Sequence, residues 1–70
     1  MEENNMIMDL EDVTLNNLME SGETVQLIFV NGYQETVRVL DFGAETLLVQ
    51  DKAGHKKMVY IHAVSTIDMG

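Results

Sequence analysis

Near its C-terminus the chain reads Met58-Val59-Tyr60-Ile61-His62-Ala63-Val64-Ser65-Thr66-Ile67. Apolar residues alternate with others at the start of this stretch, the pattern pauses at His62-Ala63, and a second short run covers residues 64–67. The pattern predicts two short strands with a tight break between them. Because so short a final strand needs an edge to pair with, we expect it to pair with another copy of the chain.

Three further strands are expected before this stretch. The clearest covers residues 24–30, is rich in β-branched and aromatic residues, and leads into Asn31-Gly32, a strong hairpin-turn signal. A return strand over residues 33–41 and a third strand over residues 46–51 follow. A polar loop that contains a glycine then leads into the fourth strand, expected over residues 57–62.

A helix is expected ahead of the strands, over about residues 10–20. Gly22 suits a left-handed residue just beyond the helix end. One helical stripe, which requires a sheet to lie on, contains Leu10, Val13, Asn17 and Leu18, with Leu15 beside it.

These segments indicate a mainly β fold with one N-terminal α-helix. Five short antiparallel strands between about residues 24 and 67 form a meander, which can curl into a small open barrel with the helix at one end. Residues 1–8 show no periodicity and are expected to be a flexible N-terminus. A single domain is therefore expected over residues 9–68.

The composition limits how a chain of this size becomes stable. Its 70 residues should bury only about 60% of their unfolded surface, so disulfides, a metal or oligomerisation are usually needed. There is no Cys, and the two His have no further ligands at metal spacing, so we expect no disulfide, metal or cofactor. Oligomerisation remains as the source of stability.

The sequence also bears on location. Its longest apolar runs, residues 27–30 and 46–49, fall far short of the ~18 residues of a membrane span. The acidic start lacks the basic region of a signal peptide. Together with the absence of Cys, these features favour a cytoplasmic protein that does not bind membranes.

The chain is strongly acidic, with a formal net charge of -8 from twelve acids and four bases. Only Arg38 is basic before residue 50, whereas Lys52, Lys56 and Lys57 surround His55. An acidic surface repels phosphate, although the acidity equally fits a role in solubility. The basic segment is either a solvated hairpin tip or a small anion site that gains charge below about pH 6.5 as His55 protonates.

Three motifs resemble the bacterial Hfq branch of the Sm/LSm family. The first is Val30-Asn31-Gly32 after an apolar strand, which matches the Asn-Gly turn of the first Sm motif. The second is Asp41-Phe42 before a Thr-Leu-Leu-Val strand, and Phe42 matches the family's Phe. The third is residues 58–66, which match the Tyr-Lys-His-Ala-Ile-Ser-Thr signature with Ile61 in place of the Lys. The resemblance covers about residues 9–67.

The resemblance implies a strongly bent five-stranded Sm barrel that forms a ring. In this family the ring is a hexamer, and the fourth strand of one subunit pairs with the fifth strand of the next. Family members are RNA chaperones in post-transcriptional regulation and bind single-stranded RNA on a proximal face, a distal face and a rim. The rim arginines are absent here, where Met19, Glu20 and Gly22 occupy the matching positions.

The family's distal face, which binds adenine-rich RNA, can be carried over residue by residue. The matching positions are Ile28, Gly32, Tyr33, Gln34, Lys57 and Thr66. The resemblance implies that a base stacks on Tyr33, because every base offers a π-face. The alternative is that Tyr33 is an exposed strand aromatic that packs across its hairpin.

The family's proximal pocket, which binds uridine-rich ends, can be carried over in the same way. The matching positions are Glu11, Ala44, Glu45, Tyr60, Ile61 and His62. Tyr60 and His62 match the family, but Ile61 replaces the Lys and Glu45 replaces a stacking ring, and each lost stack costs about 1–3 kcal/mol. We therefore expect A-rich RNA to bind better than U-rich RNA. Alternatively, His62 stabilises only the ring contact, and the acids form a solvated face or a site for cations or a basic protein.

Two functions follow. The first is an Hfq-like RNA-binding ring with weakened RNA binding. The second is a divergent Sm ring that has lost most RNA binding and serves as a protein-interaction or assembly module. An enzyme is not expected, and no catalytic residue is assigned, because no nucleophile or partnered acid lies at useful spacing from His62.

Overall fold

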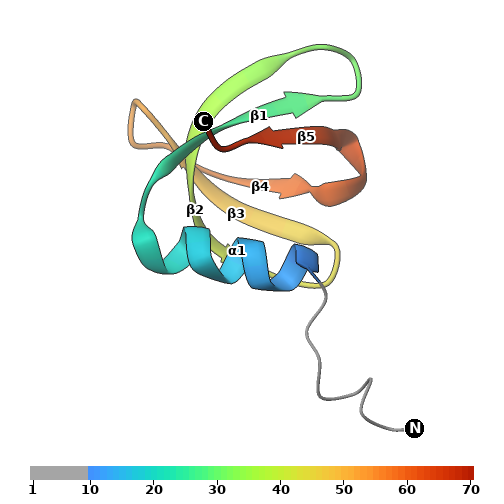
Figure 1. Cartoon of the computed structure of the whole chain (residues 1–70). Helices are drawn as coiled ribbons and strands as arrows, with labels where there is room; N and C mark the ends of the chain where they lie inside the picture. Colours follow the sequence, from blue (N-terminus) through green and yellow to red (C-terminus); the bar gives the residue numbers. More distant parts are fainter. Residues whose placement is uncertain (1–9) are drawn as a thin grey trace, which may run out of the picture.

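The computed structural model describes residues 10–70, which form one α-helix, five strands and a short 3-10 turn (Figure 1). In chain order the elements are α1 (Leu10–Ser21), β1 (Thr24–Phe29), β2 (Gln34–Phe42), β3 (Thr46–Asp51), β4 (Lys56–Tyr60), η2 (Ile61–Ala63) and β5 (Val64–Asp68). The predicted helix and strands are confirmed. The flexible N-terminus expected over residues 1–8 lies outside the described residues.

The break between the last two strands is real but begins earlier than expected. The fourth strand was predicted to reach His62, whereas β4 ends at Tyr60 and residues 61–63 form η2. Backbone hydrogen bonds anchor this turn at both ends: Ile61 N–H donates to the carbonyl of Glu45, and Val30 N–H donates to that of Ala63, each at 2.9 Å. The turn is therefore fixed to two other loops and redirects the chain.

The strands form one open antiparallel sheet in the order β4-β3-β2-β1-β5. The predicted meander is correct for β1 to β4 and wrong for β5, which crosses back to pair with β1 and places Ile67 opposite Leu27. The sheet curls strongly (Figure 1), and its register shifts between Ile28 and Phe29 and between Val39 and Asp41. As a result, β4 and β5 lie at the two edges of the sheet within the described chain.

The core lies between the inner face of the sheet and α1. Its buried residues are Leu15, Leu18, Val25, Leu27, Val37, Val39, Leu47, Val49 and Val59. Along each strand these residues alternate with more exposed ones, as expected for a sheet with one buried face. Inner and outer faces are therefore clearly distinguished.

The helix contacts the sheet through only one part of the predicted stripe and through the neighbouring Leu15. Leu15 and Leu18 are buried, whereas Leu10 is 82% exposed and Val13 is also exposed. Residues three and four apart share a helix face, so burial of Leu15 turns Glu11 towards the sheet as well. α1 has 12 residues, and no helix of the described chain is long and apolar enough to cross a membrane.

Candidate nucleic-acid interface

Three of the predicted distal residues meet on the outer face of the sheet. Ile28 on β1 pairs with Gln34 on β2 and with Thr66 on β5, so their side chains form a row across three neighbouring strands. We call Ile28, Gln34 and Thr66 the outer row. Gln34 and Thr66 are exposed and Ile28 is half-buried, so the row combines an apolar centre with a polar group on each side.

Two further predicted residues, Gly32 and Tyr33, lie in the turn beside the outer row. Gly32 has φ +90°, and the Asn31 side-chain oxygen accepts a hydrogen bond of 3.0 Å from the Tyr33 N–H, which fixes the turn. Tyr33 is 60% exposed, and its ring centroid lies 5.8 Å from that of Phe29. Tyr33 thus packs across its hairpin and still presents much of its ring to solvent.

An open hollow adjoins the Tyr33 ring. It has a volume of about 240 Å³ and is lined by Phe29, Val30, Asn31, Tyr33 and Ala63. The lining is largely apolar and contains no charged side chain. Such a surface suits the face of a planar base better than a phosphate.

Lys57, the sixth predicted distal residue, is not brought to the outer row. It pairs with the buried Val49 and therefore lies on the inner face of the sheet. Its ammonium group contacts the carboxylates of Glu35 and Asp51, the latter at 3.3 Å. The hydrogen bond to Glu35, followed by that to Asp51, raises the pKa of Lys57. Lys57 is thus charged and already paired.

The predicted proximal residues gather at η2. Tyr60 pairs with Thr46 at the start of β3, and the Ile61 N–H bonds to Glu45, so the turn that holds Ala44 and Glu45 lies beside η2. The Tyr60 and His62 ring centroids are 5.9 Å apart, and both side chains are exposed. The structure therefore brings most of this predicted set into one region.

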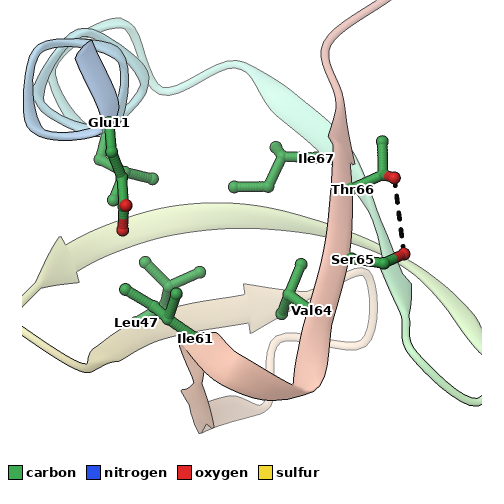
Figure 2. A pocket seen from close by; sticks show the side chains of 8 residues that line it. Glu11, Leu47, Ile61, Val64, Ser65, Thr66 and Ile67 are labelled. Atoms are coloured by element: carbon green, nitrogen blue, oxygen red, sulfur yellow. Dashed lines mark hydrogen bonds between the residues drawn. The ribbon is translucent and has the colours of Figure 1, made fainter.

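A mostly apolar pocket of about 150 Å³ opens between α1, β3, η2 and β5 (Figure 2). Its lining comprises Glu11, Leu15, Leu47, Ile61, Val64, Ser65, Thr66 and Ile67. Figure 2 shows the Glu11 carboxylate extending from the helix towards Leu47 and Ile61. Ile61 packs against the core, so an apolar side chain fits this position. We call this cavity the helix pocket; an incoming phosphate would meet a carboxylate there.

Two further side chains support the outer row, and sequence reasoning missed the first of them, Gln26. The Gln26 amide donates a hydrogen bond to the Gln34 side-chain oxygen, and Ser65 Oγ donates one of 3.1 Å to the Ile28 carbonyl. Gln26 could have been found from the sequence, because strand alternation places it on the same face as Ile28. The second depends on the long-range pairing of β5 with β1. Within residues 10–70, no three His, Asp or Glu side chains are grouped to hold a metal.

The chain is similar to known proteins in both sequence and fold. The family model described as Hfq protein matches residues 10–69. The RNA-binding protein Hfq of Clostridioides difficile (strain 630) is 35% identical over 66 residues, which are 94% of this chain and 77% of the relative. That of Natranaerobius thermophilus is 38% identical over 63 residues, or 90% and 74%.

A solved structure extends the likeness to three dimensions. It is a crystal structure described as that of the pleiotropic translational regulator Hfq, and it matches with a TM-score of 0.83. The match covers 87% of this chain and 100% of the other at 23% sequence identity. The likeness supports the Sm fold.

Proposed function

This chain belongs to the Hfq family, and on that premise we propose that it is an RNA-binding protein of post-transcriptional regulation. The observation that carries the proposal is the outer row, in which Ile28, Gln34 and Thr66 stand in register on three adjacent strands. Its action is to bind and present single-stranded RNA as a chaperone, without bond chemistry. The expected setting is the cytoplasm.

The outer row and the adjoining turn offer complementary contacts to a base. The exposed ring of Tyr33 provides a stacking surface. The amide of Gln34 both donates and accepts hydrogen bonds, as does the hydroxyl of Thr66, so each can read the edge of a base. Adenine-rich RNA is the expected ligand here, with Gly32 allowing close approach of the strand at the turn.

The helix pocket and η2 form the weaker of the two proposed RNA sites. Tyr60 and His62 are exposed and near one another, which supports a contact to a uridine or an RNA end. Glu11, Glu45 and the apolar Ile61 oppose it, because they provide negative charge where phosphate would lie and no compensating cation. Uridine-rich RNA is therefore expected to bind less tightly than adenine-rich RNA.

The protein is expected to act as a ring. β4 and β5 are the two edge strands of the described sheet, and pairing β4 of one subunit with β5 of the next would satisfy both edges. A hexamer is the size expected from the family. Repetition of the outer row around such a ring would strengthen binding of one long strand through high effective concentration.

The decisive experiment measures binding of oligo-adenylate and oligo-uridylate by fluorescence anisotropy at moderate salt, on protein whose sedimentation has been determined. We expect a ring that binds adenylate more tightly than uridylate. Failure of both RNAs to bind at tens of micromolar protein would refute RNA binding and favour an assembly module that contacts other proteins. Sedimentation as a monomer at micromolar concentration would refute the ring alone.

A further inference from the structure

A second row crosses the outer face, closer to the β3–β4 hairpin. Arg38 on β2 pairs with Gln50 on β3, and Gln50 pairs with Lys56 on β4. The Arg38 guanidinium donates a hydrogen bond of 2.8 Å to the Gln50 side-chain oxygen, and the Gln50 amide donates one of 3.1 Å to the Gly54 carbonyl. Gln50 therefore links Arg38 to the hairpin turn and holds its guanidinium in place.

Lys52 completes this group. Arg38 and Lys52 line the same shallow hollow of about 100 Å³, and Arg38, Lys52 and Lys56 are all exposed. We call Arg38, Gln50, Lys52 and Lys56 the basic row. It gathers three of the four Lys and Arg residues of a chain with net charge -8, so it is the surface where repulsion of phosphate is weakest.

One carboxylate, that of Asp51, also lines the hollow. Its Oδ1 accepts hydrogen bonds from the N–H groups of Ala53 and His55, at 3.0 and 2.9 Å, and its Oδ2 lies 3.3 Å from the ammonium of Lys57. The carboxylate is thus occupied within the hairpin. The remaining side chains of the hollow, apart from Arg38 and Lys52, are uncharged.

We propose that the basic row binds the phosphates of an RNA strand whose bases occupy the outer row. The two rows share strand β2, where Gln34 and Arg38 lie on the same face, about 13 Å apart at ~3.3 Å per residue. Between them on β2 stands the uncharged Thr36, and the carboxylate of Asp68 on β5 lines the same hollow as Thr36, so the strand must pass beside one acid. Guanidinium groups suit phosphate because they can donate two parallel hydrogen bonds. This inference rests on the proposed function and adds to it a path for the strand.

The test compares a short oligo-adenylate with a long single-stranded RNA over a series of salt concentrations. The variants are Arg38→Gln and the double variant Lys52→Gln/Lys56→Gln, whose exposed hairpin positions put little at risk in the fold. Asn17→Asp on the exposed part of α1 is the control, because it lowers the net charge by one, as Arg38→Gln does, away from the row. Sedimentation verifies that each variant keeps the assembly state of the wild type.

Both basic-row variants should weaken binding of the long RNA, and the slope of log affinity against log salt should fall by about 0.7 for each phosphate that the variant no longer neutralises. The short adenylate should bind as before, and Asn17→Asp should change neither. If the long RNA binds these variants with unchanged affinity and slope while the short adenylate still binds the wild type, the basic row does not bind RNA and the proposed function stands. If the wild type binds neither RNA, both proposals are wrong.

Discussion

The outer row and the helix pocket share β5 and yet present opposite chemistry to RNA. Thr66 lies in the outer row, while Ile67, the next residue, pairs with the buried Leu27 on the inner face. The outer row carries neutral polar groups beside an exposed ring, whereas the helix pocket carries apolar side chains and the carboxylate of Glu11. Because Thr66 lines the helix pocket as well, the two surfaces meet at this residue of β5, and alternation lets their other residues change charge independently.

The largest expected effect is a loss of stability when a core side chain is truncated, and it should be greater beneath the outer row than beside the helix pocket. Leu27 is fully buried directly behind the outer row, so Leu27→Ala should cost about 2–5 kcal/mol of the free energy of unfolding. Ile61 lies at the rim of the core and is half-buried, so Ile61→Ala should cost clearly less. Urea denaturation at equal protein concentration measures the free energy of unfolding of both variants. Equal losses would contradict the expectation that the core beneath the outer row contributes more to stability.

A smaller effect concerns the stacking ring. Tyr33→Ala should weaken oligo-adenylate binding by about 1–3 kcal/mol per stacked base, which is roughly five- to 150-fold. Tyr33→Phe should retain most of the affinity because it keeps the ring. Tyr60→Ala removes an equally exposed tyrosine near the helix pocket and serves as the control in anisotropy titrations. Unchanged adenylate affinity in Tyr33→Ala would remove this turn from the RNA site.

Substitutions at the helix pocket should have a smaller effect, and they should raise RNA affinity instead of lowering it. The double variant Glu11→Gln/Ile61→Lys removes a carboxylate and adds a cation, so uridylate affinity should rise by about fivefold, or ~1 kcal/mol, while adenylate affinity stays the same. The double variant Asn17→Lys/Glu20→Gln, at two exposed positions further along α1, changes the net charge by the same two units and is the matched control for charge. A gain for both RNAs alike would mean that net charge alone governs binding.

The smallest expected effect is on pH dependence. The hydrogen bond from the His55 N–H, aided by Lys57, lowers the pKa of Asp51 below 3.8, so its contribution to stability is present above that pH and is lost as pH falls through the lowered value. The pKa of Lys57 is raised above 10.5, so its contribution is present below that pH and is lost as pH rises through the raised value.

Thermal unfolding should therefore be insensitive to this cluster between about pH 5 and pH 9 and should weaken beyond both limits. Asp51→Asn keeps an oxygen that can accept the backbone hydrogen bonds and removes the charge, so its melting temperature should vary less at acid pH than that of the wild type. Identical acid dependence in the two proteins would show that other carboxylates control it.

Local patterns predicted most of the fold. The Asn31-Gly32 turn and the break near His62 are encoded in neighbouring residues, and the structure confirms both. The pairing of β5 with β1 joins residues about 40 positions apart, as in Leu27 opposite Ile67, and leaves no local signature. The buried stripe of the helix was predicted only in part, because a short helix offers several apolar stripes. Contact with the sheet selects Leu15 and Leu18 and leaves Leu10 and Val13 exposed.

For the candidate sites, the positions of some residues were predicted correctly and that of Lys57 was not. The gathering of Tyr60, His62 and Glu45 around η2 agrees with the positions inferred from the family resemblance. Lys57 was expected beside the outer row, although alternation with the buried Val59 already pointed it inwards. Its pairing with Glu35, from a different strand, follows from the curl of the sheet and could not be read from spacing alone.

The edge strands and the two register shifts together influence how many copies of the chain assemble. Contact of one copy's β4 with another copy's β5 is head-to-tail, and such contacts close only when the rotation per subunit divides a full circle; otherwise they grow into open filaments. Register shifts of this kind increase local bend and twist, so those at Ile28/Phe29 and Val39/Asp41 help to set that rotation. Substitutions at the second of these shifts, which lies outside the outer row, should change how many copies assemble while leaving the outer row in place.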